Sequence, residues 1–314
     1  MNPQFLLLAG GLGAASAVLH TALLTGSPAA FILAYLAQLP LFVAGLWMGT
    51  TAAGLAAAAG TLAAFAGGGF VFALAYLLAN ALPAFVVVRQ ALLWRPGKDG
   101  AIRFYPLGNI LLMLVGMIGA LFVGMIFAFS GAEGGLEGAL KRFIVEAFQA
   151  IRAPGLDNAR LEPFAEGIAR VFPGIVGVSW LFMVVVNAAL AQGLVARFGA
   201  PKRPSPSIVE LDLPAALLGL VAIFAAGSIL PGLGGFVSRN MIVVFVAVYA
   251  LAGFGVLHAL VARRQWRGLA LGASYGAVIV FGWPIAVFAI LGLVEPLSNF
   301  KARALGRAPT GSQE

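Results

Sequence analysis

Few side chains in this sequence could do chemistry within its long apolar segments, and most of those few are uncharged. Tyr76 and Asn80 are four residues apart, so a helix would place them on one face, and Trp180 and Asn187 share a face of a later helix. Asn109 stands near the start of another apolar run. Such groups either line a pocket for a small polar or aromatic ligand or join helices by hydrogen bonds. Both interpretations stay open for these five candidate ligand-binding residues.

Patterns typical of catalytic or metal sites are missing. The sequence has no cysteine, and its two histidines, His20 and His258, are far apart, so we expect both near the ends of helices rather than in a metal site. There is no phosphate-binding Gly-rich loop, GxSxG elbow or HExxH pair. The middle of each apolar run lacks acidic and basic residues, which disfavours proton-coupled carriers and ion pumps. We predict no enzyme activity, no cofactor and no metal ion.

The composition indicates a protein whose solvent is the lipid bilayer. Apolar residues make up 61% of the 314 residues and charged residues only 10%, whereas soluble domains are about a quarter charged. The net charge is +8, but the basic residues stand in short clusters between apolar runs. That arrangement is typical of membrane topology rather than of a nucleic-acid-binding face, so we expect the bilayer, and no nucleic acid, as a partner.

The apolar runs predict an all-α, polytopic transmembrane helical bundle. About 20 apolar residues are needed to cross the hydrocarbon core, and about nine segments meet or approach that length, although a count of eight also fits. A kink or break is expected in the last segment at Pro284. The segments cover residues 5–24, 29–47, 49–66, 69–92, 107–129, 172–195, 213–230, 239–262 and 269–294.

Basic clusters between the segments predict the orientation. With nine spans the three clusters share one side, which the positive-inside rule makes cytoplasmic, and the N-terminus is then cytoplasmic in an inner (plasma) membrane. An odd count puts the basic C-terminal tail on the other side, so either the tail is an exception or the count is off by one. The clusters contain Arg95, Lys98 and Arg103, then Arg197, Lys202 and Arg203, then Arg263, Arg264 and Arg267.

Residues 131–171, between the fifth and sixth segments, differ from the rest. Their apolar residues, including Leu136, Leu140 and Ile144, recur at helical spacing with charged residues on the opposite face. After the APGLDN turn a second such set begins at Leu161. We expect an amphipathic helical hairpin that lies on the outer surface or covers the bundle.

Small residues in the first segment could permit close helix contacts. Gly10 and Ala14 form one pair four residues apart, and Gly13 and Ala17 form another. Close packing through small residues matters in lipid because the hydrophobic effect contributes little between helices. These four residues are candidates for contact with a partner helix, and packing within the chain is the alternative.

Two stretches carry a resemblance to known families. LPLFVAGLWMGTTAAGLAAAAGTL resembles the second and third helices of the substrate-binding S components of energy-coupling-factor vitamin transporters. NMIVVFVAVYALAGFGVLHALVARR and GLVEPLSNFKAR resemble the uncharacterised YybS-like family of bacterial membrane proteins. The resemblance implies an S-component-like six-helix unit over 1–196, which includes 131–171, a Pro-rich cytoplasmic loop over 197–212, three further helices over 213–297 and a polar tail over 298–314.

The resemblance further implies a docking surface on the first helix for a membrane coupling subunit. The function expected from it is transport-related binding of a small molecule. The alternative is a structural or assembly factor of the cell envelope that acts through protein partners.

Overall fold

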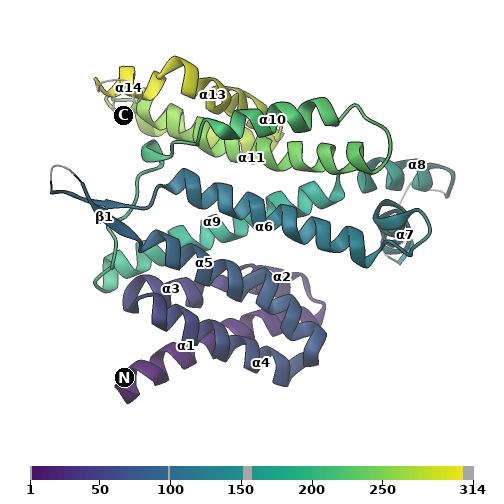
Figure 1. Ribbon diagram of the computed structural model, residues 1–314, viewed down its shortest axis with the longest axis horizontal. Helices are drawn as coiled ribbons and strands as arrows, with labels where there is room; N and C mark the ends of the chain where they lie inside the picture. The colour runs from purple at the N-terminus through teal and green to yellow at the C-terminus, as the bar shows by residue number, and fades with distance from the viewer. Residues whose placement is uncertain (1, 98–99, 151–157, 307–314) are drawn as a thin grey trace. The chain divides into compact units, whose positions relative to one another are not determined.

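The computed structural model describes residues 2–97, 100–150 and 158–306, which are helical apart from loops and one β-hairpin (Figure 1). This confirms the predicted all-α bundle. In the hairpin, β1 (Trp94–Pro96) pairs antiparallel with β2 (Ile102–Phe104). The chain forms two compact units. Unit 1 consists of Met1–Ile110 and Trp180–Pro206, and unit 2 consists of Leu111–Ser179 and Ser207–Glu314.

Six runs in the described chain are long and apolar enough to cross a membrane, which is the architecture of a multi-pass membrane protein. The first run is α1 (Pro3–Thr21) with the 3₁₀ turn η1 (Ala22–Thr25), and the second is α2 (Pro28–Tyr35) with α3 (Gln38–Met48). The third run contains α4 (Thr50–Tyr76), the π-helical turn η2 (Leu77–Ala81) and α5 (Leu82–Ala91). The fourth and fifth runs are α6 (Leu107–Ala128) and α9 (Phe172–Phe198). The sixth run is α11 (Gly232–Val261), and the shorter apolar helices are α10 (Ala216–Gly227), α12 (Arg267–Phe281) and α13 (Ile285–Ser298).

The helical run Thr50–Ala91 reverses direction at Gly69. This residue has φ 75° and ψ −169°, a conformation that only glycine adopts readily. The two arms then pack on each other, since a Cβ atom added at Gly60 would overlap the Tyr76 hydroxyl and one at Gly54 would contact the Phe85 ring. The run therefore contains the two segments predicted at 49–66 and 69–92 as separate, antiparallel helices.

Helix α1 packs against α4 through one of its two small-residue pairs. A Cβ atom at Gly13 would overlap the carbonyl oxygen of Ala56, and Ala17 is also buried. Gly10 has open space around its Cβ position, and Ala14 is exposed. Packing within the chain thus occupies Gly13 and Ala17, whereas Gly10 and Ala14 remain uncovered in the described chain.

Two of the predicted cytoplasmic basic clusters meet at one end of unit 1. The Arg203 guanidinium donates hydrogen bonds to the carbonyls of Ala91 (3.0 Å) and Tyr105 (3.2 Å). The Lys202 N–H donates to the Leu46 carbonyl at 3.0 Å. The loops that follow α3, α5 and α9 are therefore on the same side of the helices, as the basic clusters predicted. Lys98 and Asp99 lie outside the described residues.

The last apolar segment of the sequence is two helices rather than one. Helix α12 ends at Phe281 and α13 begins at Ile285, so the expected break at Pro284 is confirmed. Beyond α13, the short helix α14 (Phe300–Leu305) returns to the end of α11, where Arg263 donates to the Leu305 carbonyl at 3.1 Å.

Lys301 also fixes α14 at this end of unit 2. Its ammonium group donates to the Leu211 carbonyl at 2.9 Å and pairs with Asp212, next to the 3₁₀ turn η3 (Ile208–Glu210). Because α12 and α13 double back, the start of the tail and the Arg263 cluster share one end of unit 2. The number of spans and the side of the tail stay predictions. Arg307 lies outside the described residues.

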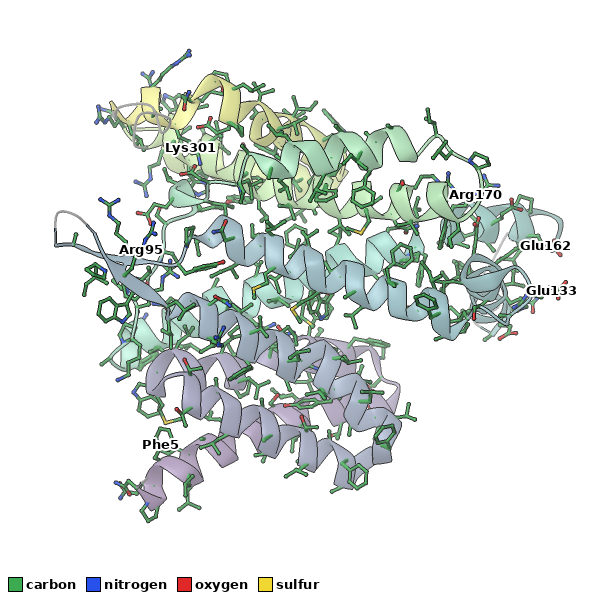
Figure 2. The ribbon with its side chains drawn as sticks, viewed as in Figure 1. Phe5, Arg95, Glu133, Glu162, Arg170 and Lys301 are labelled. Atoms are coloured by element: carbon green, nitrogen blue, oxygen red, sulfur yellow. The ribbon has the colours of Figure 1, made fainter. Side chains whose placement is uncertain are left out.

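The predicted amphipathic hairpin is present as α7 (Gly135–Ala150) and α8 (Asn158–Ala169). Leu136, Leu140 and Ile144 are buried along α7, as are Leu161 and Ala165 along α8. Charged groups join the helices on the outside, where Glu133, Glu162 and Arg170 gather at the end of unit 2 opposite Lys301 (Figure 2). Residues 153–157 of the APGLDN turn lie outside the described residues.

Neither compact unit coincides with the predicted segment 1–196. The fifth and sixth helices predicted in that segment, α6 and α9, are each divided between the two units, and the α7–α8 hairpin belongs to unit 2. The boundary between the units at 206/207 divides the predicted loop 197–212, and unit 2 contains the rest of that loop together with 213–297 and 298–314. The family organisation inferred from the resemblance stays a prediction.

Single cysteines will test the position of the tail, since the natural chain has none. We expect Ala304→Cys and Gln265→Cys to react with a membrane-impermeant maleimide from the same side of the membrane, and Gly131→Cys to react from the other side. Intact cells and inverted vesicles supply the two sides. Labelling of Ala304→Cys and Gly131→Cys from the same side of the membrane would contradict the doubled-back arrangement.

A matched pair of alanine substitutions will test the α1–α4 contact. Gly13→Ala should destabilise the protein by about 1–3 kcal/mol, because the new methyl group overlaps a backbone carbonyl. Gly10→Ala should stabilise it by about 0.5–1 kcal/mol, because alanine favours the helix and has open space there. Unfolding in mild detergent, followed by circular dichroism, measures both. Equal effects of the two substitutions would show that this contact does not hold the helices together.

Candidate functional site

The interior of unit 1 contains a group of polar side chains that we call the polar core. All of its members are buried except Trp180, which is half-buried. The polar core consists of Ser16, His20, Gln38, Tyr76, Asn80, Trp180 and Asn187. It thus includes four of the five predicted ligand-binding residues. The fifth, Asn109, is half-buried near the start of α6 and lies outside it.

The carbonyl of Ala79 connects three parts of the polar core. Proline has no N–H, so Pro83 cannot donate to the carbonyl four residues before it, and the helix forms the π-helical turn η2 at this place. The Ala79 carbonyl accepts hydrogen bonds from Gln38 Nε2 at 2.7 Å and from Trp180 Nε1 at 2.9 Å. Helices α3 and α9 are in this way both bonded to η2.

A second set of contacts joins α1 to the α4 arm. The Tyr76 hydroxyl donates to Ser16 Oγ at 2.7 Å, and Ser16 donates in turn to the Ala37 carbonyl. Asn80 Nδ2 lies 3.3 Å from His20 Nδ1, and the rings of His20 and Tyr76 are edge to face at 5.3 Å. These contacts hold α1, α3 and the second arm of α4 together.

His20 lies in the last turn of α1, near the end of the helix as predicted, but its side chain is buried and only 6% exposed. The 3₁₀ turn η1 continues the helical run to Thr25. Sequence analysis also missed Ser16. The signal was available, since Gly13, Ser16, Ala17 and His20 follow helical spacing and form one face, all of it buried.

Three amide side chains of the polar core have oxygen atoms with no hydrogen-bond partner in the described chain. These atoms are Gln38 Oε1, Asn80 Oδ1 and Asn187 Oδ1. Asn187 Nδ2 donates to the carbonyls of Tyr35 and Met183, both at 2.7 Å, which directs its oxygen away from them. A buried acceptor without a donor costs about 1–3 kcal/mol. The polar core therefore offers unused acceptors to any donor that enters it.

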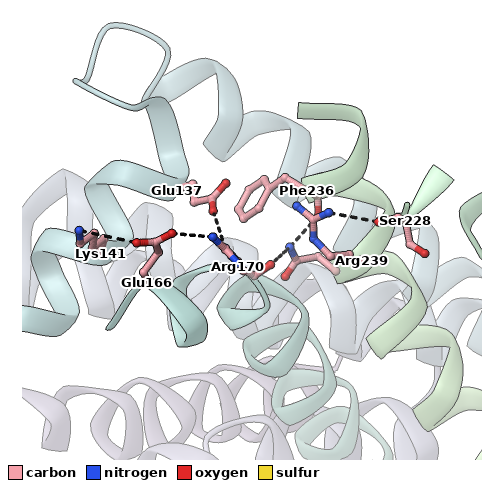
Figure 3. A network of polar contacts seen from close by, with 8 residues as sticks. Glu137, Lys141, Glu166, Arg170, Ser228, Phe236 and Arg239 are labelled. Atoms are coloured by element: carbon pink, nitrogen blue, oxygen red, sulfur yellow. Dashed lines mark hydrogen bonds and ion pairs between the residues drawn. The ribbon is translucent and has the colours of Figure 1, made fainter. Parts of the chain in front are cut away.

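Unit 2 contains a buried asparagine whose amide is fully bonded. Asn240 Oδ1 accepts from the Gly174 N–H at 2.7 Å, and Nδ2 donates to the carbonyls of Arg170 (2.9 Å) and Phe236 (2.8 Å). The Arg170 side chain continues into ion pairs with Glu166 and Glu137, as Figure 3 shows. Asn240 thus joins α11 to the start of α9 and shows how a structural amide is satisfied in this protein.

The helix predicted over 239–262 starts earlier in the structure. Helix α11 begins at Gly232, so Arg239 lies two turns inside it rather than at its start. Arg239 Nη1 donates to the Ser228 carbonyl at 3.1 Å, while its buried Nε has no partner.

Other kinds of site are less developed. Across residues 2–97, 100–150 and 158–306, no group of three or more His, Asp and Glu side chains could hold a metal ion. An open pocket of about 580 Å³ lies on the α7–α8 hairpin, with acidic and basic side chains mixed in its lining, among them Glu133, Lys141 and Glu162. Lys141 is engaged with Glu162 at 3.6 Å, so the charges of this pocket largely satisfy one another.

No protein-family model matches the chain, and no curated protein or solved structure is significantly similar to it. The resemblance to S components and to the YybS-like family therefore stays a prediction. What the protein does has to be argued from its own geometry.

Replacement of Asn240 by leucine will test whether this amide joins the helices of unit 2. Asn240→Leu should destabilise the protein by about 2–4 kcal/mol, because the Gly174 N–H and the Arg170 carbonyl lose their partner while buried. Asn109→Leu, the same exchange at a half-buried position, should change stability by less than about 0.5 kcal/mol. Thermal unfolding in mild detergent measures both, and equal stabilities would show that the Asn240 contacts contribute little.

Proposed function

We propose that this multi-pass membrane protein binds a small molecule in the polar core of unit 1, as a transport-related binding protein. The proposal is carried by one observation, the unpartnered buried oxygens of Gln38, Asn80 and Asn187. A ligand that donates hydrogen bonds would satisfy them. The acceptors indicate an uncharged or cationic ligand with N–H or O–H groups rather than an anion.

The physical argument rests on the bilayer as solvent. Lipid chains supply no hydrogen-bond donors, so a buried amide oxygen must find one in the protein, in an internal water molecule or in a ligand. Asn240 shows that a buried amide in this chain can be satisfied completely by backbone groups. The acceptors of the polar core differ in this respect, which favours a role beyond joining helices.

The resemblance to S components supports the same proposal. In that family the first helix docks on a membrane coupling subunit through small residues. Gly10 and Ala14 are uncovered in the described chain and would serve for such docking, whereas Gly13 and Ala17 are already packed on α4. We further propose an inner-membrane location with the N-terminus and the basic loops in the cytoplasm, by the positive-inside rule.

A role in envelope assembly is the second candidate, and one observation favours it. Phe143 and Phe164 are exposed on the α7–α8 hairpin, which lies outside the long apolar runs. Large aromatic side chains are enriched in the interfaces between proteins. Co-purification of an envelope protein that is lost in Phe143→Ser would support this candidate.

Asn80→Leu will test the binding proposal. Native mass spectrometry of wild-type protein, purified gently from its own membranes, should show a retained small molecule as a mass increment. Asn80→Leu should weaken retention by about tenfold, since it removes an acceptor worth about 1.4 kcal/mol. The same variant should lower the stability of the ligand-free protein by no more than about 1 kcal/mol, because it removes the contact with His20 together with an unsatisfied oxygen.

Asn109→Leu is the matched control and should retain the ligand like the wild type. A wild-type protein that carries no small molecule would contradict the proposal, and so would equal retention by the wild type and Asn80→Leu. Either result would indicate that internal water, rather than a ligand, satisfies these oxygens.

A further inference from the structure

Arg239 is a charged residue inside an apolar helix, and no acidic group of the described chain pairs with it. Its single described hydrogen bond goes from Nη1 to the Ser228 carbonyl, and its buried Nε has no acceptor. An ionisable side chain within a membrane helix is costly and usually has a functional partner. The missing counter-ion is therefore the question that this residue raises.

Glu137 and Glu166, the two acidic residues of the network around Arg170, are engaged with cations other than Arg239. Figure 3 shows Glu137 and Glu166 joined to Arg170, and Glu166 also joined to Lys141, whereas Arg239 is joined to Ser228. Among the described residues, no carboxylate of the hairpin pairs with Arg239. A counter-ion from outside the described residues would therefore complete this site.

The backbone around Arg239 makes room for the guanidinium. A Cβ atom at Gly235 would overlap the Leu230 carbonyl and lie 2.9 Å from Arg239 Nη1. On the adjoining helix, a Cβ atom at Gly227 would overlap the Ser238 hydroxyl, so α10 and α11 are in close contact here. The two glycines permit the side chain to reach the loop between α10 and α11 instead of the apolar interior.

That loop is strongly apolar and exposed. The Ile229 side chain is 85% exposed, and Leu230 and Leu233 are exposed as well. In a membrane protein such side chains contact acyl chains, while an arginine one or two turns away extends to the headgroup level. The Cα atom of Arg239 is two turns inside α11, but its Nη1 is bonded to the Ser228 carbonyl, so the guanidinium lies beside this apolar loop. The surface thus presents a cation next to apolar side chains, the combination that a lipid with an anionic headgroup and acyl chains would contact.

We propose that Arg239 binds the phosphate group of an anionic phospholipid, whose acyl chains lie against Ile229, Leu230 and Leu233. A guanidinium offers paired donors to two phosphate oxygens, and one negative charge neutralises Arg239. A lipid with a net charge of −1, such as phosphatidylglycerol, fits better than one whose headgroup adds a second cation. This site is independent of the polar core of unit 1.

The experiment uses full-length protein in mild detergent and native mass spectrometry with dioleoylphosphatidylglycerol or dioleoylphosphatidylcholine. Wild-type protein should bind the first phosphatidylglycerol molecule more tightly than phosphatidylcholine. Arg239→Gln should weaken the phosphatidylglycerol binding about tenfold. Arg239→Lys keeps the charge but not the paired donors, so its affinity for phosphatidylglycerol should lie between those of the wild type and Arg239→Gln. Arg267→Gln, an exposed arginine at the opposite end of unit 2, should behave like the wild type.

Equal binding of phosphatidylglycerol by wild type and Arg239→Gln would overturn the proposal, and so would equal binding of the two lipids by the wild type. Glycerol phosphate has a phosphate group but no acyl chains, so it distinguishes a site for a lipid from a site for a free phosphate. If it protects the protein against thermal unfolding as well as phosphatidylglycerol does, the lipid assignment is wrong. Should Arg239→Gln fail to fold, the comparison of the two lipids on wild type and Arg239→Lys decides the matter.

Discussion

Pro83 has no N–H to donate to the Ala79 carbonyl four residues before it, and hydrocarbon contains no water that could donate instead. Gln38 and Trp180 supply the missing donors from two other helices. The position of α3 and α9 around η2 follows from this one requirement. The remaining contacts of the polar core are arranged around the same point, since Asn80 is the next residue and bonds to α1 through His20.

Glycine serves a second requirement, the close approach of helix backbones. In unit 1 a Cβ atom at Gly13 would overlap the Ala56 carbonyl, and in unit 2 one at Gly253 would overlap the Phe288 carbonyl. Gly292 faces the Tyr249 carbonyl in the same way. The hydrophobic effect contributes little to helix association in lipid. The van der Waals contacts that these short separations allow therefore stabilise the packing of the helices. Gly69 has a different use, since its positive φ lets the chain turn back.

Buried polar groups are satisfied unevenly in both units. Asn240 in unit 2 bonds its whole amide to backbone groups, whereas three amides of unit 1 keep an unpartnered oxygen, and Tyr249 and Glu295 in unit 2 each keep one as well. Ion pairs lie at the ends of the helices, where Lys301 pairs with Asp212 and Arg170 pairs with Glu137. Arg239 lies inside a helix and has no such pair among the described residues. The two proposals concern the amide oxygens of the polar core and the Arg239 guanidinium.

Composition and periodicity alone determined that the chain is a bundle of membrane helices, that residues 131–171 form an amphipathic hairpin, and that the last run breaks at Pro284. These features depend on which residue types follow one another, and local physics decides them. Only the tertiary structure decided that α12 and α13 double back, that His20 and Ser16 belong to the polar core, and that Asn240 bonds to Gly174. Hydropathy records how apolar a segment is but not which way it returns, and the hydrogen bonds that distinguish a satisfied amide from an open one join residues dozens of positions apart.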